Sequence, residues 1–409
     1  MQTTTDPRTP ASGPTTFHLR CVRCDWRTGP RFLLRCPSCS GALEPVLDLT
    51  GAAPREHHRP ELAYLDFLPV DAADLPDAAL SVATPCRPAP RLGEAIGVPG
   101  LWVKDESRQP TGTTKDRFAA VVLAVFRRFG ITEWVASSTG NSSTALAHAV
   151  SGDATMRAHF FCGADFIGDQ RFSPGERVSL TCVDGCYATA SAAAVRFAED
   201  RGLTWEGGFF NWARREGLKL TYLEAYDAMR AAGTAPGVVV QAISSGMGVV
   251  AAHKGTEEYL GLGRLPARPR FLMVQQDTCA PMARAWAEGR AELTDADVVA
   301  DPRGLARAIL LGDGRATYPY LHGIARAGGG AIVAVPQDEL VTAKAMLAEL
   351  EGLDVCHSSA ATVAALRAEA AAGRLDPDEV ALAVLTGRDF TGPDRPAPDR
   401  PDTTAGGSA

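Results

Sequence analysis

Apolar and polar positions alternate with two different periods along most of the chain. Short, almost wholly apolar runs predict buried strands, and the segments after them carry apolar residues three or four positions apart, which predicts amphipathic helices. "GVVVQAIS" (237–244) is such a run, and "GMGVVAAHKGTEEYLG" (246–261) is the helix that follows it. Buried strands that alternate with helices are typical of parallel sheets covered on both faces. The pattern therefore predicts an α/β fold.

The same reasoning assigns the remaining elements. The predicted strands are 101–105, 133–138, 157–162, 179–184, 237–244, 270–276, 331–336 and 379–387. The predicted helices are 92–97, 115–130, 141–150, 187–200, 212–233, 246–261, 338–352 and 358–373. Residues 52–100 are rich in proline and are otherwise expected to form loops.

Composition narrows the class of protein. The chain has 409 residues, of which 45% are hydrophobic and 22% are charged, and its formal net charge is −7. Binders of nucleic acid or of membrane surfaces carry basic patches or tails, and the sequence has neither, so we expect no such partner. No stretch approaches about 20 uninterrupted apolar residues, and the first residues do not resemble a signal peptide. We therefore expect a cytoplasmic protein that acts on small molecules.

Four of the ten cysteines follow a metal-binding spacing. Cys21, Cys24, Cys36 and Cys39 form C-x2-C-x11-C-x2-C, and two turns of this kind can place four thiolates around a zinc ion. Because all four positions would be filled by protein, the zinc would be structural. A metal-free module or a pair of disulfides is the alternative, and a cytosolic location disfavours disulfides. The other six cysteines lie in apolar surroundings and are expected to be buried.

Three turns between a strand and a helix are rich in glycine and hydroxyl residues. They are "TGTTKDR" (111–117), "SSTGNSS" (137–143) and "SSGMG" (244–248). Ligands bind at the carboxyl ends of parallel strands, and free N–H groups at a helix start favour an anion. One such turn is common, but three of them together with Lys115 fit a cofactor that has an aldehyde and a phosphate. The sequence therefore predicts pyridoxal phosphate on Lys115.

Four segments resemble the threonine synthase-like group of fold-type II pyridoxal phosphate enzymes. They are "PTGTTKDR", "SSTGNSSTALAHA", "FFNWARREGLKL" and "LTGRDF". The resemblance covers roughly residues 18–390, and paired CxxC motifs near the N-terminus are also common in this group. It implies the tryptophan synthase β-like fold, with two α/β domains, and a homodimer.

The resemblance implies a role for each motif. Lys115 matches the lysine that holds the cofactor as a Schiff base, Asn141 the asparagine at the ring hydroxyl, and Thr386 the hydroxyl residue at the pyridine nitrogen. The phosphate-binding turn corresponds to Ser244, Ser245, Gly246, Met247 and Gly248. The loop that grips the substrate carboxylate corresponds to Ser138, Thr139, Gly140 and Ser142. Candidates for binding a phosphate leaving group are Asn211, Arg214 and Arg215.

The resemblance also implies a class of reaction. A threonine rather than an aspartate at the ring nitrogen favours prompt loss of a leaving group, and so elimination and replacement. The arrangement of segments is most similar to cysteate synthase. This implies β-replacement, through an aminoacrylate, on an O-phosphoserine-like amino acid with sulfite or another small nucleophile. Threonine synthase, acting on O-phosphohomoserine, and another β/γ-eliminating lyase of specialised metabolism are the alternatives.

Plainer explanations of the same residues stay open. Lys115 on the surface, Asn141 as a helix cap and Thr386 as an ordinary strand end would have no role in catalysis. Arg214 and Arg215 would then form a solvated helix face. The chain would in that case be a non-catalytic protein that binds pyridoxal phosphate or uses its zinc ribbon for interactions.

The expected domain organisation follows from the motifs. The zinc-ribbon-like module is 17–48, the large cofactor domain is 49–110 with 237–390, and the small mobile α/β domain is 111–236. The termini, 1–16 and 391–409, are rich in Pro, Asp, Thr and Gly, and we expect them to be disordered tails.

Overall fold

The computed structural model describes residues 16–78 and 80–391. Nearly all of both predicted tails lies outside these residues. The described chain divides into two compact units, and each is treated by itself below. The first unit contains residues up to 132 together with 207–389, and the second contains 133–206 with the short segment 390–391.

The first unit is built on a six-stranded sheet with the order β12-β11-β10-β13-β5-β4. All neighbouring strands are parallel except β4, which runs antiparallel to β5. The strands are β4 (Cys86–Pro88), β5 (Leu101–Asp105), β10 (Val238–Ala242), β11 (Arg270–Gln276), β12 (Ala331–Val335) and β13 (Ala381–Leu385). The carboxyl ends of β5, β13 and β10 therefore lie side by side at one edge.

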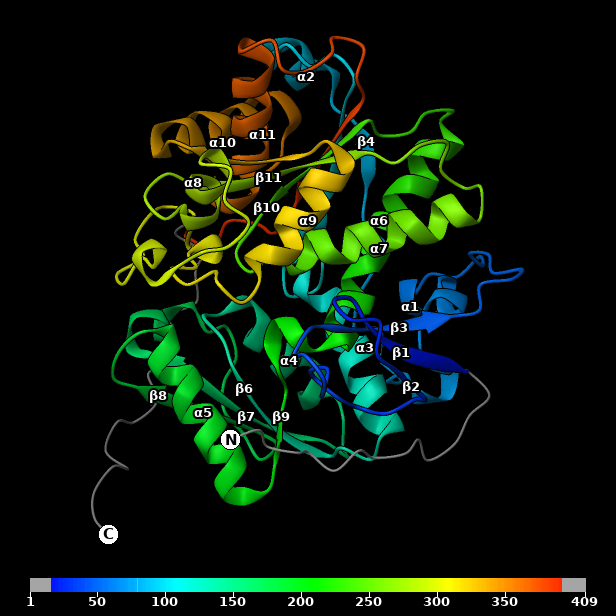
Figure 1. Ribbon diagram of the computed structural model, residues 1–409, viewed down its shortest axis with the longest axis vertical. Coiled ribbons are helices and arrows are strands. Elements are labelled where there is room, and N and C mark those ends of the chain that lie inside the picture. The colour runs from blue at the N-terminus through cyan, green and yellow to red at the C-terminus, as the bar shows by residue number, and fades with distance from the viewer. Residues whose placement is uncertain (1–15, 79, 392–409) are drawn as a thin grey trace. The chain divides into compact units, whose positions relative to one another are not determined.

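Helices bury both faces of this sheet (Figure 1). Val238 and Val240 belong to the apolar core shared with α2, α10 and α11, while Val239, between them, points to the opposite face and is also buried. This is why the strands read as unbroken apolar runs. The helices of the unit are α1 (Pro60–Ala63), α2 (Pro90–Ile96), α3 (Lys115–Arg128), α6 (Trp212–Ala231), α7 (Met247–Gly261), α8 (Pro281–Ala287), α9 (Tyr318–Gly328), α10 (Gln337–Glu351) and α11 (His357–Ala371).

The cysteine module is a small antiparallel sheet attached to the first unit. Its order is β2-β1-β3, with β1 at Phe17–Cys21, β2 at Arg27–Thr28 and β3 at Leu43–Leu47. The ring of Phe17 lies 5.7 Å from that of Trp212, at the start of α6. The guanidinium of Arg215 donates to the carbonyl of Leu43. The module is therefore packed on the beginning of α6.

The second unit has a four-stranded parallel sheet with the order β8-β7-β6-β9. Helix α5 covers one face, where Val135 and Phe161 pack on Ala194 and Ala198. The elements are β6 (Glu133–Ser137), α4 (Asn141–Ser151), β7 (Arg157–Gly163), β8 (Val178–Val183), α5 (Tyr187–Arg201) and β9 (Thr204–Trp205).

The predicted α/β fold with parallel sheets is confirmed, and several details differ from the prediction. The second unit is shorter than the small domain expected at 111–236, because α3 and α6 pack closely on each other within the first unit. Helices α1, α8 and α9 and the short strands β4 and β9 were not predicted. Of the six cysteines expected to be buried, Cys162 and Cys279 are buried, whereas Cys86, Cys186 and Cys356 are partly exposed. Cys182 is exposed, since β8 is an edge strand of its sheet.

The crossing of α3 and α6 depends on Gly217. A Cβ atom there would lie 2.5 Å from the Cα of Phe118 and 2.6 Å from the carbonyl oxygen of Arg117. We therefore expect Gly217→Ala to lower the free energy of unfolding by about 1–3 kcal/mol through overpacking. In α9, Gly323 has open space around its Cβ position, so Gly323→Ala should stabilise the protein by up to about 1 kcal/mol. Thermal unfolding of both variants tests this; equal effects of the same sign would contradict it.

Candidate active site

Lys115 is the first residue of α3, at the end of a tight turn that follows β5. The carboxylate of Asp116 accepts hydrogen bonds from the backbone N–H and the hydroxyl of Thr111, both at 2.7 Å, and so closes the turn. The N–H of Lys115 itself donates to the hydroxyl of Thr113 at 3.3 Å. These bonds fix the backbone of the turn and leave the lysine side chain out of it.

A buried ion cluster anchors the first turn of α3. The guanidinium of Arg117 lies 2.8 Å from the carboxylate of Glu106 and 2.6 Å from that of Glu224, and Lys104 lies 2.7 Å from Glu224. Burial acts to raise the pKa of Glu106, but the charges of Arg117 and Lys104 hold it down at about 2. Removing one member of such a cluster leaves an uncompensated buried charge, which costs about 3–5 kcal/mol.

Lys115 differs from the other lysines of the chain in having no acidic partner among the described residues. Lys104, Lys219, Lys254 and Lys344 each form an ion pair with a carboxylate. Burial and the nearby positive charge of Arg214 lower the pKa of Lys115 to about 8. Its amine is therefore substantially neutral, and so nucleophilic, at mildly alkaline pH.

The glycine-rich turn after β10 offers free N–H groups. Gly246 caps α7 in the left-handed conformation, at φ 76°, and a Cβ there would meet the side chain of Leu321 at 2.4 Å. Within the described chain, no hydrogen bond is formed by the N–H groups of residues 245–248. They lie at the start of a 15-residue helix, where the helix dipole favours an anion. The turn thus fits a phosphate.

Thr386 lies directly beside the lysine turn. The N–H of Thr114 donates to the carbonyl of Thr386 at 2.9 Å, and the N–H of Arg388 donates back to Gly112 at 3.0 Å. A Cβ at Gly387 would come within 3.0 Å of the Thr113 side chain, so the two segments touch. The hydroxyl of Thr386 forms no hydrogen bond with any residue that the structure describes. It is free to meet a ligand.

Helix α6 contacts both the lysine turn and the glycine-rich turn. The hydroxyl of Thr221 is 3.4 Å from that of Thr114, and the Tyr222 hydroxyl donates to Gln241, just before the glycine-rich turn, at 2.6 Å. Since β5, β13 and β10 are also neighbours in the sheet, the first unit brings Lys115, Thr386 and residues 244–248 to one edge.

The second unit carries the serine- and threonine-rich turn between β6 and α4. The Ser138 hydroxyl accepts hydrogen bonds from the N–H groups of Gly140 and Ser143, at 3.1 and 3.2 Å, so Ser138 shapes the turn. Thr139 and Ser142 are partly exposed, and their side chains form no hydrogen bond with a described residue. Asn141 begins α4, and its Oδ1 accepts a hydrogen bond from Arg171 at 2.9 Å.

The three candidates around "NWARR" have different environments. Asn211 caps α6, because its Oδ1 accepts the N–H of Ala213 at 3.0 Å. The guanidinium of Arg215 donates to the carbonyls of Phe209 and Leu43. Arg214 is buried, lies 4.6 Å from the centre of the Phe118 ring, and acts electrostatically on Lys115. Of the three, Arg214 alone is linked to the lysine turn by these contacts.

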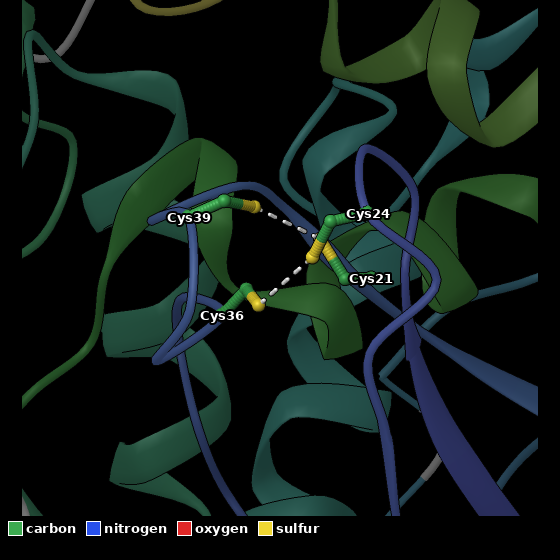
Figure 2. A group of neighbouring side chains, drawn as sticks. All are labelled: Cys21, Cys24, Cys36 and Cys39. Atoms are coloured by element: carbon green, nitrogen blue, oxygen red, sulfur yellow. Dashed lines mark hydrogen bonds between the residues drawn. The ribbon is translucent and has the colours of Figure 1, made fainter.

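The four cysteines of the module converge, as Figure 2 shows. Their sulfur atoms all lie within 4.8 Å of one another, with Cys21 3.4 Å from Cys39 and Cys24 3.6 Å from Cys36. Four sulfurs placed tetrahedrally at about 2.3 Å from a zinc ion would be about 3.8 Å apart. The cluster therefore has the ligand set and spacing of a structural zinc site.

Comparison with known proteins places the chain in a family. The family model described as "Pyridoxal-phosphate dependent enzyme" matches residues 80–387, and the chain belongs to this family. It is 27% identical to threonine synthase from Methanosarcina acetivorans, over 91% of both chains. It is 28% identical to cysteate synthase from Methanospirillum hungatei JF-1, over 91% of this chain and 90% of that one.

Solved structures support the same fold. Threonine deaminase isoform 2 from Solanum lycopersicum matches with a TM-score of 0.63 and 15% identity, covering 80% of this chain and 88% of its own. Serine racemase from maize matches with a TM-score of 0.61 and 16% identity, covering 75% of this chain and 88% of its own. The fold-type II assignment made from the motifs is confirmed. No helix in the described part of the chain is both long and apolar enough to span a membrane.

Two groups around the site had no clear signal in the sequence. Glu106 and Glu224 are separated by more than a hundred residues, and nothing in the sequence links either of them to Arg117. Arg171 follows a short 3-10 helix (Ala164–Asp169) and belongs to no motif. Arg117, two residues after the turn lysine in "KDR", was the one available hint of a buried ion cluster.

The charge of Arg214 should be measurable at Lys115. In cofactor-free protein, attachment of pyridoxal phosphate needs the neutral amine, so its rate should rise with pH around a midpoint near 8. Arg214→Met removes the charge that disfavours the ammonium and should move this midpoint to higher pH, whereas Arg214→Lys should leave it nearly unchanged. Stopped-flow absorbance across pH measures the midpoints. A midpoint that Arg214→Met does not move would contradict the electrostatic link.

Proposed function

We propose that this protein replaces the phosphate of an O-phosphoserine-like amino acid with a small nucleophile, in the manner of a cysteate synthase. The observation that carries the proposal is the amine of Lys115, which has no acidic partner among the described residues and whose pKa is lowered to about 8. Lys115 lies at the same edge of the sheet as the turn of residues 244–248, with its free N–H groups, and the hydroxyl of Thr386. These groups match the lysine, the phosphate turn and the threonine that the motifs predict.

The residues fit pyridoxal phosphate. Lys115 would hold it covalently, the N–H groups of residues 245–248 would receive its phosphate, and Thr386 would meet its ring nitrogen. Asn141, in the second unit, is assigned to its ring hydroxyl. When bound, the cofactor supplies an electron sink for negative charge at the substrate Cα. The freed amine of Lys115 is the base that takes the Cα proton and later returns a proton to the product.

The proposed substrate contacts are divided between two turns. Thr139, Gly140 and Ser142 are assigned to the substrate carboxylate, with Ser138 shaping that turn from within. Arg214 is assigned to the phosphate leaving group, since it is a buried cation near Lys115. The hydrogen bonds of Asn211 and Arg215 suit them better to holding the start of α6 than to touching substrate. The predicted homodimer and the cytoplasmic location stay predictions.

Threonine synthase is the second candidate, with O-phosphohomoserine as substrate. The similarity to the Methanosarcina acetivorans protein, at 27% identity, favours it about as strongly as the similarity to a cysteate synthase favours the first proposal. The two substrates differ by one carbon between the amino acid and the phosphate. Their discrimination therefore depends on the distance between Lys115 and the phosphate-binding group.

The two candidates predict different spectral responses. We expect purified protein to show a visible band from its lysine-bound cofactor, and we expect O-phosphoserine to shift this band and release inorganic phosphate. O-phosphohomoserine should do neither, because its phosphate lies one carbon further out. Absorbance and a phosphate assay, with Lys115→Ala as the inactive control, measure both. A response to O-phosphohomoserine alone would favour threonine synthase, and a silent protein would contradict both candidates.

We also propose structural zinc in the cysteine module. Because the module packs on Trp212 and Arg215, losing the metal should destabilise the start of α6. We expect about one zinc per chain by elemental analysis, and a thermal midpoint several degrees lower for Cys36→Ser. Cys279→Ser, at a buried cysteine outside the module, is the matched control for loss of a thiol and should keep its zinc. Zinc-free wild-type protein with an unchanged thermal midpoint would contradict the assignment.

A further inference from the structure

A short segment after β7, residues 169–171, lies along the turn that carries Asn141. The carbonyl oxygen of Asp169 occupies the space beside Gly140, where a Cβ atom would come within 2.8 Å of it. The side chain of Gln170 hydrogen-bonds the Ser143 hydroxyl, and the N–H of Arg171 donates to Thr144 at 3.2 Å. The segment is therefore bonded to both the turn and the first residues of α4.

The side chain of Arg171 fixes the orientation of the Asn141 amide. Its Nη2 donates to Asn141 Oδ1 at 2.9 Å, and its Nη1 donates to the Asp169 carbonyl at 3.3 Å. A guanidinium has only donors, so the amide atom that faces it must be the carbonyl oxygen. The Nδ2 group of Asn141 is then left as a donor, and it suits an acceptor such as an ionised ring hydroxyl.

Phe390 covers the guanidinium of Arg171 from one face. The Cζ atom of Arg171 lies 3.6 Å from the centre of the Phe390 ring, a distance typical of a cation–π contact. Phe390 belongs to the second unit, and it follows Thr386 by only four residues along the chain. The segment that leaves the end of β13 thus terminates on the arginine that holds Asn141.

We propose that Arg171 and Phe390 are positioning residues, which act on the cofactor through Asn141. Arg171 holds the amide with its N–H2 group available, and Phe390 restricts the guanidinium. The inference rests on the role assigned to Asn141 in the proposed function. The inference adds that Asn141 can fill this role only when its N–H2 group is held in a fixed orientation.

A double-mutant cycle tests the proposal with a readout separate from activity. Pyridoxal phosphate is titrated into cofactor-free protein, and its dissociation constant is read from fluorescence. Arg171→Met should weaken binding about tenfold, because the Asn141 amide would lose the charge-assisted hydrogen bond that orients it. Asn141→Ala should have a similar effect, and Arg171→Met should add little when Asn141 is already alanine.

Further variants separate positioning from folding. Arg177→Met is the matched control, because Arg177 is in the same unit and its side chain donates to the carbonyl of Ser151. It should leave the dissociation constant unchanged. Arg171→Lys and Phe390→Leu keep most of the local packing and should each weaken binding about two- to fivefold. If circular dichroism shows that Arg171→Met does not fold, the dissociation constants of Arg171→Lys and Phe390→Leu test the proposal in its place.

The outcomes distinguish this inference from the proposed function. If wild-type protein binds the cofactor but the effects of Arg171→Met and Asn141→Ala multiply, Arg171 does not act through Asn141 and the inference is overturned, while the proposed function stands. Unchanged binding in Arg171→Met, or in Asn141→Ala, also overturns it. If wild-type protein does not bind pyridoxal phosphate, both fail.

Discussion

The ion cluster of Arg117, Glu106, Glu224 and Lys104 determines where the amine of Lys115 can be. Side chains two positions apart on a helix are related by a rotation of about 200° around its axis, so they lie on nearly opposite sides. Because Arg117 is drawn into the interior by two carboxylates, Lys115 must point the other way. Every charge in the cluster is compensated inside the cluster, so no carboxylate is left over to pair with Lys115. An unpaired, partly buried lysine is thus a consequence of how its neighbours are paired.

The same arrangement recurs in the second unit. Ser138 and Ser143 use their hydroxyls inside the turn, and Arg171 holds one end of the Asn141 amide. The Nδ2 group of Asn141 and the backbone N–H groups of Asn141 and Ser142 form no hydrogen bond with a described residue. In both units, a functional group is made available because the polar residues next to it are already bonded to protein. Charge and hydrogen bonding within each turn therefore decide which of its polar residues can meet a ligand.

Much of the fold and the centre of the site could be predicted from sequence. The apolar runs of β10 and β13 need burial on both faces, and turns such as 244–248 need glycine, so local pattern alone identifies them. The partners of Arg117 and Arg171 could not be found this way, because their contacts join residues that only the fold brings together. The hydrogen bonds of Asn211 and Arg215 could not be predicted for the same reason: a motif gives residue types but not the direction of side chains. The three residues of β4 are too few to give a period, so this edge strand was expected to be loop.

The central claim is that Lys115 holds pyridoxal phosphate, and reduction followed by peptide mapping tests it most directly. Borohydride makes the link between cofactor and lysine permanent, and mass spectrometry of the digested protein then locates the pyridoxyl group. The account predicts the label on the peptide that contains Lys115, because the chain's other lysines are held as ammonium groups by carboxylates. A label on Lys104, Lys219, Lys254 or Lys344, or no label on any lysine of protein purified with the cofactor, would contradict it.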